Sequence, residues 1–127
     1  MKVSVGIIKN SRDQILISNR KKNKIFNDHW EFPGGKLKGE ESSDEALGRE
    51  LNEELGIVAT QIQQIENVKY KYSDFTILLI PFLVIDYSGV IINKEGQALK
   101  WVSLGQLNQT KIMPASKPVI KYLEDNN

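Results

Sequence analysis

Three glutamates, Glu50, Glu53 and Glu54, lie at spacings that would bring their carboxylates together on a helix. Residues three or four apart are neighbours on a helix surface, so Glu50 would lie beside both of the others. Two carboxylates about 5.5 Å apart repel by roughly 3 kcal/mol at an effective dielectric of about 20, but by less than about 1 kcal/mol in open water. The cluster is therefore either a solvated helix surface or a site whose ligand brings positive charge.

Neighbouring residues favour a ligand site. A Pro33-Gly34-Gly35 turn lies upstream, and glycines let the backbone approach a ligand closely. Glu40 and Glu41 add carboxylates, and the planar guanidinium of Arg49 could orient them. Hard oxygen donors without a nearby histidine or thiolate favour Mg²⁺ or Mn²⁺ over zinc, and Mg²⁺ commonly combines a few carboxylates with substrate phosphates. The residues alone therefore predict a metal and phosphate site.

The helix that must position these glutamates can be bounded from the sequence. Ser42 or Ser43 can cap a helix that starts near Asp44, and Gly56 can end it in a left-handed conformation. Apolar residues recur at helical spacing and predict one buried side, made of Ala46, Leu47, Leu51 and Leu55. The sequence thus predicts an amphipathic helix that carries the acidic cluster.

The remaining elements predict a mixed α/β fold. Strands at residues 3–8 and 15–17 would flank a turn at 10–13, and residues 21–30 would form a loop. A second helix is expected over residues 114–124, with Pro118 in its first turn, where a missing N–H is tolerated. Further strands are expected at residues 68–72, 75–85 and 99–102. This order predicts a mixed sheet with helices packed on it.

Length and composition exclude several classes of protein. The 127 residues predict a single domain over 1–127, and 40% hydrophobic with 26% charged residues is typical of globular proteins. The net charge of +1 gives no field that would recruit nucleic acid or a membrane. The absence of cysteine excludes disulfides, thiolate nucleophiles and zinc–thiolate sites. The N-terminal residues turn polar too early for a signal peptide or membrane span, so we expect a cytoplasmic protein. A monomer is a separate expectation.

The spacing of the acidic cluster resembles the Nudix box. Its fixed positions are matched by Gly35, Glu41, Arg49-Glu50-Leu51, Glu53-Glu54 and Gly56-Ile57. The likeness extends to the MutT branch of that family, the 8-oxo-dGTP diphosphatases. It includes residues 30–36 at the start of the box, and residues 94–97, 101–104, 114–115 and 118–120 after it. The resemblance therefore covers nearly the whole chain.

The resemblance implies a fold, a reaction and a set of site residues. The fold would be the Nudix fold, an α/β/α sandwich around a mixed sheet, with the box as a loop-helix-loop. The reaction would be attack of water on a nucleoside triphosphate, with release of the monophosphate and pyrophosphate. The implied cofactor is Mg²⁺, with Mn²⁺ possible, and the implied ligands are the Gly34 carbonyl, Glu50, Glu53, Glu54 and Glu95.

Catalytic and substrate-binding residues are implied in the same way. Glu50 would be a further metal ligand or would orient or deprotonate the attacking water, and either Glu50 or Glu53 could be the general base. Arg49 would hold the glutamates in place. Arg20 and Lys36 would face the phosphates. The nucleotide site would be lined by Glu31, Phe32, Pro33 and Gly34, with Tyr72, Phe75 and Ser116 near the base.

The residues near the base depart from the MutT pattern. Ser116 stands where that pattern has an asparagine that hydrogen-bonds the oxidised guanine, and a hydroxyl cannot offer a donor and an acceptor in one plane. Ser116 could instead cap the second helix. Phe75 stands where the pattern has a basic residue, and with Tyr72 it could stack on a base or belong to the strand's core.

The sequence leaves three other functions as alternatives. A pyrophosphohydrolase acting on CTP or dCTP is the nearest alternative to an 8-oxo-dGTP diphosphatase. A Nudix module that binds a nucleotide without turnover is disfavoured, because Glu50, Glu53 and Glu54 are all present. Hydrolysis of nucleoside diphosphate derivatives is also disfavoured, because relatives of that kind carry additional residues downstream of the box.

Overall fold

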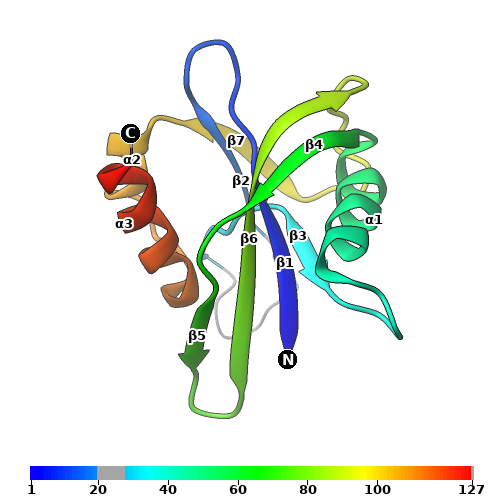
Figure 1. Ribbon diagram of the computed structural model, residues 1–127. Coiled ribbons are helices and arrows are strands. Elements are labelled where there is room, and N and C mark those ends of the chain that lie inside the picture. The colour runs from blue at the N-terminus through cyan, green and yellow to red at the C-terminus, as the bar shows by residue number, and fades with distance from the viewer. Residues whose placement is uncertain (20–27, 127) are drawn as a thin grey trace.

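Figure 1 shows the computed structural model, which describes residues 1–19 and 28–126. The strands are β1 Lys2–Ile7, β2 Ile15–Asn19, β3 Gly34–Lys36, β4 Val58–Gln64, β5 Val68–Lys71, β6 Thr76–Ser88 and β7 Ala98–Val102. The helices are α1 Ser43–Leu55, α2 Leu104–Leu107 and α3 Lys117–Asp125, with a 3₁₀ turn, η1, at Pro114–Ser116. In this part of the chain no helix is long and apolar enough to cross a membrane.

A mixed five-stranded sheet forms the centre of the molecule. Strand β1 runs parallel to β6, with Val3 opposite Leu79, and antiparallel to β3, with Val5 opposite Gly34. Strands β4 and β5 pair antiparallel with successive parts of the other edge of β6. The long β6 therefore connects the β1–β3 side of the sheet, where the Gly34 segment lies, to the β5 hairpin.

The first two predicted strands and the turn between them form, but β1 and β2 belong to different sheets. The Asn10 side-chain oxygen accepts N–H bonds from Arg12 and Gln14, at 2.9 and 3.0 Å. After a short bridge between Lys9 and Ile15, the chain leaves β1, and β2 pairs with β7 in a separate two-stranded sheet. Alternating apolar residues indicate a strand but not its partner, because pairing depends on contacts distant in sequence.

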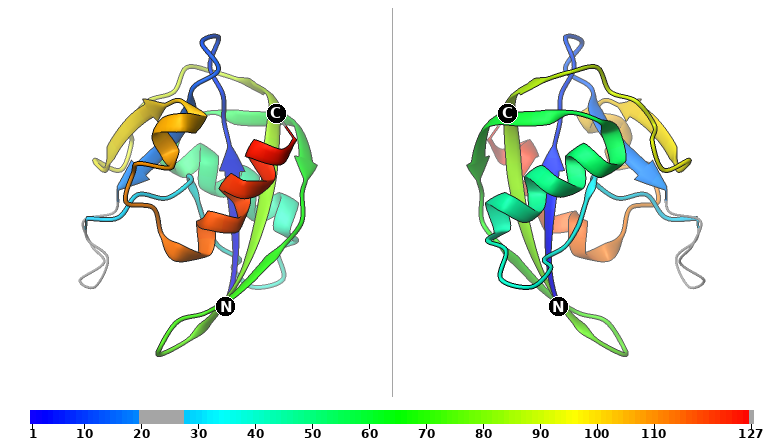
Figure 2. Two further views of the ribbon diagram at one scale, coloured as in Figure 1. Left: turned by 90° about the vertical axis from the view of Figure 1, so that its left-hand side faces the viewer. Right: turned by 90° about the vertical axis from the view of Figure 1, so that its right-hand side faces the viewer.

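Helices cover both sides of the central sheet, as Figure 2 shows. On one side α1 packs over a cluster that includes Leu47, Leu51 and Phe82. On the other, α3 contributes Val119, Ile120 and Leu123 to a second cluster. This arrangement is the α/β/α sandwich that the family resemblance implied.

Helix α1 begins and ends at the predicted residues. The Ser42 hydroxyl accepts the Glu45 N–H at 3.2 Å, and the Glu45 carboxylate accepts the Ser42 N–H at 3.0 Å, which forms a capping box. Gly56 ends the helix in a left-handed conformation, with φ of 70°. The four apolar residues predicted to be buried, Ala46, Leu47, Leu51 and Leu55, are each 0% exposed.

Sequence patterns missed β3, β4 and α2 and placed one helix start too early. Gly34 and Gly35, which were predicted to lie in a turn, belong to β3 because they pair with β1. Strand β4 is an edge strand with a polar, bulged sequence, so it lacks the alternation that identifies a half-buried strand. Helix α2 has only four residues. Residues 114–116 form a 3₁₀ turn, and α3 begins at Lys117 with Pro118 in its first turn.

Replacement of Gly48 by alanine should stabilise the protein. Gly48 lies inside α1, and a Cβ atom built there meets nothing within 4 Å. Glycine inside a helix costs about 0.5–1 kcal/mol relative to alanine, mainly through backbone entropy. Gly48→Ala should therefore raise the free energy of unfolding in urea by about that amount, with kcat/KM unchanged. A loss of stability would contradict the open space around Gly48, because it would show that the added methyl group meets neighbouring atoms.

Candidate active site

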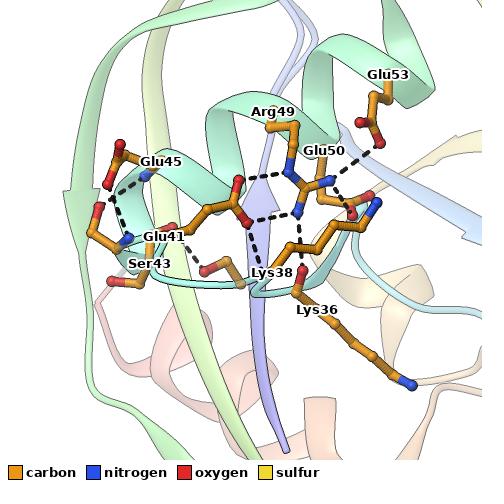
Figure 3. Close-up of polar contacts among 10 residues, drawn as sticks. Lys36, Lys38, Glu41, Ser43, Glu45, Arg49, Glu50 and Glu53 are labelled. Atoms are coloured by element: carbon orange, nitrogen blue, oxygen red, sulfur yellow. Dashed lines mark hydrogen bonds and ion pairs between the residues drawn. The ribbon is translucent and has the colours of Figure 1, made fainter.

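Arg49 is the centre of a hydrogen-bonded cluster on α1, drawn in Figure 3. Its Nε and Nη2 donate to the two oxygens of Glu41 at 2.6 and 3.0 Å. Its Nη1 donates to Glu50 at 2.9 Å and to Glu53 at 3.2 Å, and its Nη2 also donates to the Lys36 carbonyl at 3.0 Å. One guanidinium thus contacts three carboxylates and reduces the repulsion expected between two of them, Glu50 and Glu53.

Glu41 holds the loop before α1 against this cluster. Besides its two bonds from Arg49, it accepts the Lys38 N–H at 2.8 Å. These hydrogen bonds, that of Arg49 first, lower the pKa of Glu41 from 4.5 to about 2. The hydrogen bonds to Glu41 and then Glu50 raise the pKa of Arg49 above its usual range, so Arg49 and Glu41 are both charged at neutral pH.

Glu41→Gln should change how stability depends on pH. A carboxyl whose pKa is lower in the folded state stabilises the protein above its unfolded pKa, and that contribution is lost as the pH falls through the folded pKa. The variant should therefore melt at a lower temperature than the wild type at pH 7. The difference should shrink between pH 4.5 and about 2. Melting temperatures measured across this range test the prediction, and a difference independent of pH would contradict it.

Glu50 is held between α1 and β3. Its side chain is 13% exposed. A Cβ atom at Gly35 would lie 2.4 Å from the Glu50 carboxyl carbon, so only glycine leaves room for this carboxylate against the strand. Glu50 is thus fixed by Arg49 on one side and by β3 on the other.

The remaining acidic residues differ in exposure. The Glu53 side chain is 45% exposed, whereas Glu54 is 1% exposed and is the one charged residue buried in the described part of the chain. Glu95 is exposed, in the loop after β6. The Lys94 N–H in that loop donates to the Glu54 carbonyl at 3.0 Å, which places Glu95 near the C-terminal end of α1.

The donors around α1 suit a hard cation but do not form a closed cage. Across residues 1–19 and 28–126, no three His, Cys, Asp or Glu side chains assemble into a metal site. The available donors are carboxylate and carbonyl oxygens. Mg²⁺ binds through one or two carboxylates together with waters and substrate phosphates, so it does not require a cage built only from protein. These residues therefore fit a hard divalent cation that completes its coordination with a substrate.

A cavity of about 180 Å³ opens beside β3. Seven of the residues expected to bind substrate line it: Glu31, Phe32, Gly34, Lys36, Tyr72, Phe75 and Ser116. Pro33 is not among the lining residues, and its carbonyl accepts the Gly6 N–H at 2.8 Å, which ties the turn to β1. Arg20 lies outside the described residues.

Sequence reasoning missed the apolar walls of the cavity. They consist of Met1, Val3, Val5, Ile77, Leu79, Met113 and Ala115. Val3 and Val5 alternate along β1, and Ile77 and Leu79 alternate along β6, so one side of each strand contributes to the wall. The alternation was readable from the sequence, but it does not reveal which buried side encloses a cavity.

Tyr72 links two of the walls. Its hydroxyl accepts the Ala115 N–H at 3.1 Å, and burial raises its pKa. Ser116 follows Ala115 and is 3% exposed. Ser116 precedes α3, but its side chain makes no capping hydrogen bond, so the alternative role of Ser116 as a helix cap is wrong. The Ser116 residue instead borders the cavity.

Strand β3 joins the cavity to the acidic cluster. Gly34, Gly35 and Lys36 line the cavity. From the other side, Gly35 lies under the Glu50 carboxylate and the Lys36 carbonyl accepts from Arg49. The cavity and the acidic cluster are therefore neighbours, with only the short strand β3 between them.

Comparisons with known proteins agree on one family. A family model described as a NUDIX domain matches residues 4–122. The 8-oxo-dGTP diphosphatase of Escherichia coli K12 is 37% identical over 124 residues, which cover 98% of this chain and 96% of that protein. The CTP pyrophosphohydrolase of the same organism is 39% identical over 92 residues, 72% of this chain and 68% of that protein. A solved structure from work on MutT of Aliivibrio salmonicida and Vibrio cholerae has a TM-score of 0.84 and 32% identity, with 100% of both chains covered.

Proposed function

Since this chain belongs to the Nudix family of hydrolases, we propose that it converts nucleoside triphosphates to monophosphates and pyrophosphate, with 8-oxo-dGTP as its main substrate. Support for the substrate comes from the 8-oxo-dGTP diphosphatase of E. coli, which matches nearly the full length of both chains. The proposal includes action as a cytoplasmic monomer on free nucleotides.

The observation that carries the proposal is the position of β3 between the cavity and the acidic cluster. A cavity with apolar walls and a few polar residues, next to carboxylates, suits a ligand with a flat aromatic ring at one end and a charged, metal-binding group at the other. A nucleoside triphosphate has this form. Its base would occupy the cavity, and its phosphates would lie toward Glu50 and Lys36.

The proposal assigns a role in metal binding or catalysis to each of the following residues. The Gly34 carbonyl, Glu50, Glu53, Glu54 and Glu95 would hold Mg²⁺, or Mn²⁺ in its place. When bound, the metal would polarise phosphate oxygens and lower the pKa of a coordinated water.

Glu50 would also accept the proton of the attacking water, a role that its fixed position beside β3 supports. Arg49 would keep Glu50 and Glu53 in place. Lys36 and Arg20 would neutralise phosphate charge.

CTP or dCTP is the second candidate substrate. Ser116 supplies a hydroxyl at the cavity and no carboxamide, so it cannot pair with an oxidised guanine through two hydrogen bonds. The similarity to the CTP pyrophosphohydrolase of E. coli favours the same alternative.

A comparison of substrates tests both candidates. With Mg²⁺ present, kcat/KM should be measured for 8-oxo-dGTP, dGTP, dCTP and CTP, with pyrophosphate identified as a product. A strong preference for 8-oxo-dGTP is the expected result. A preference for a cytosine nucleotide would show that 8-oxo-dGTP is not the main substrate, but it would leave the proposed reaction unchanged. Binding of nucleotides without any release of pyrophosphate would identify a binding module and overturn the proposal.

A further inference from the structure

Three aromatic rings follow one another at the hairpin between β5 and β6. The ring centroids of Tyr70 and Tyr72 are 4.7 Å apart, and those of Tyr72 and Phe75 are 5.1 Å apart. The Tyr72 N–H donates to the Phe75 carbonyl at 2.8 Å and closes the turn that brings the last two rings together. Figure 1 shows this hairpin extending from the body of the molecule.

The two rings that line the cavity differ in what they can offer a ligand. Tyr72 is 9% exposed, its ring contacts two other rings, and its hydroxyl is bonded to Ala115. Phe75 is 43% exposed, and its ring lies at 30° to that of Tyr72, in a stacked arrangement. A ring that is stacked on one side and 43% exposed can offer its other face to a further planar group.

We propose that Phe75 supplies the face on which the substrate's base stacks, and that Tyr72 is a positioning residue that orients Phe75 and the Ala115–Ser116 wall. This inference rests on the proposed function, because it assigns roles to residues at the base end of the same site. It assigns Tyr72 no stacking contact with the base.

Stacking on a phenyl ring has a consequence for specificity. Every base has a π face, so stacking gives affinity with little discrimination between bases. Phe75 carries no charge and no hydrogen-bonding group that could distinguish an oxidised from an unoxidised guanine. Phe75 therefore strengthens binding of 8-oxo-dGTP and dGTP alike, and discrimination between them falls to polar groups such as the Ser116 hydroxyl.

The test compares variants on three substrates: 8-oxo-dGTP, dGTP and deoxyribose 5′-triphosphate, which lacks a base. Phe75→Ala should lower kcat/KM for both nucleotides by about 5- to 150-fold, mainly through KM, and leave their ratio unchanged. The baseless triphosphate should be affected less than about twofold; if its turnover is slow, its inhibition constant against dGTP serves instead. Phe75→Trp should keep kcat/KM close to that of the wild type, because tryptophan also has a π face. Phe75→Leu should lose activity as Phe75→Ala does, because leucine is apolar but has no π face.

Tyr72→Phe tests the positioning role. This variant keeps the ring and removes only the hydroxyl that accepts the Ala115 N–H. KM for the nucleotides should rise by about 2- to 12-fold, with kcat and the baseless triphosphate unaffected. A fall in kcat on all three substrates would show a general structural effect and would overturn the role.

Other outcomes separate this inference from the function on which it rests. A wild type that hydrolyses no nucleoside triphosphate would overturn the proposed function, and the inference with it. An active wild type whose Phe75→Ala variant has unchanged KM, or loses activity equally on the baseless triphosphate, would overturn the stacking role alone. A change in the ratio of kcat/KM for 8-oxo-dGTP to kcat/KM for dGTP would show that Phe75 distinguishes the two bases. That result would also contradict the inference.

Discussion

Replacing Glu50 with glutamine is expected to lower kcat by about 10²- to 10⁴-fold, the usual contribution of a positioned general base. The amide has nearly the same shape and can still accept the hydrogen bond from Arg49, but it cannot take a proton from water. Because the side chain still fits against Gly35, stability should change little. Steady-state kinetics with Mg²⁺, together with a urea unfolding curve, measure both effects.

Two further variants make the result specific. Asp44→Asn makes the same chemical change at an exposed position in the first turn of α1, and it should leave kcat unaltered. Glu53→Gln should weaken metal binding, so higher Mg²⁺ should partly restore its activity, whereas Glu50→Gln should not recover. If the metal rescues Glu50→Gln but not Glu53→Gln, the two roles are exchanged and Glu53 is the base.

Gly34→Ala should have the largest effect on the fold. Gly34 has φ of 152°, a conformation that side chains rarely adopt. A Cβ atom there would lie 2.0 Å from the Ser4 carbonyl oxygen and 2.7 Å from the Val5 Cα, both in the backbone of the central strand β1. Strained backbone costs about 1–3 kcal/mol and overpacking a further 1–3 kcal/mol, so we expect a loss of roughly 2–6 kcal/mol in the free energy of unfolding.

Gly39→Ala is the matched control for this loss. Gly39 also has a positive φ, of 56°, but a Cβ atom there meets nothing within 4 Å. The free energy of unfolding of this variant should fall by only about 1–2 kcal/mol, the cost of placing alanine in a left-handed conformation. Urea unfolding of both variants separates the two causes. Equal losses would show that β1 moves to accept the new methyl group and that the close approach of β3 is not essential.

The acidic helix was predictable because the interactions that define it are local. Ser42, Gly56 and the four apolar residues that repeat between them determine its start, its end and its buried side. The spacing of the box also identified the family and hence the Nudix fold, which the family match and the solved structures confirm. These features needed only residues that lie near one another along the chain.

The partners of the strands were not predictable, because pairing depends on segments distant in sequence. The turn at Asn10 formed as expected, yet β2 pairs with β7, some eighty residues further on. The polar edge strand β4 was missed, since its residues satisfy no period that local patterning recognises.

In the site, the sequence by itself determined which groups could do chemistry: the box glutamates, Arg49 and the pair Gly34-Gly35. Only the tertiary structure decided how they are arranged. It placed Arg49 between Glu41, Glu50 and Glu53, brought β3 between the acidic cluster and the cavity, and turned Ser116 toward the cavity and away from a capping role. The reason is physical. Residue type and spacing fix what a side chain can donate, accept or neutralise, whereas its neighbours are set by the packing of strands and helices that meet only in the folded chain.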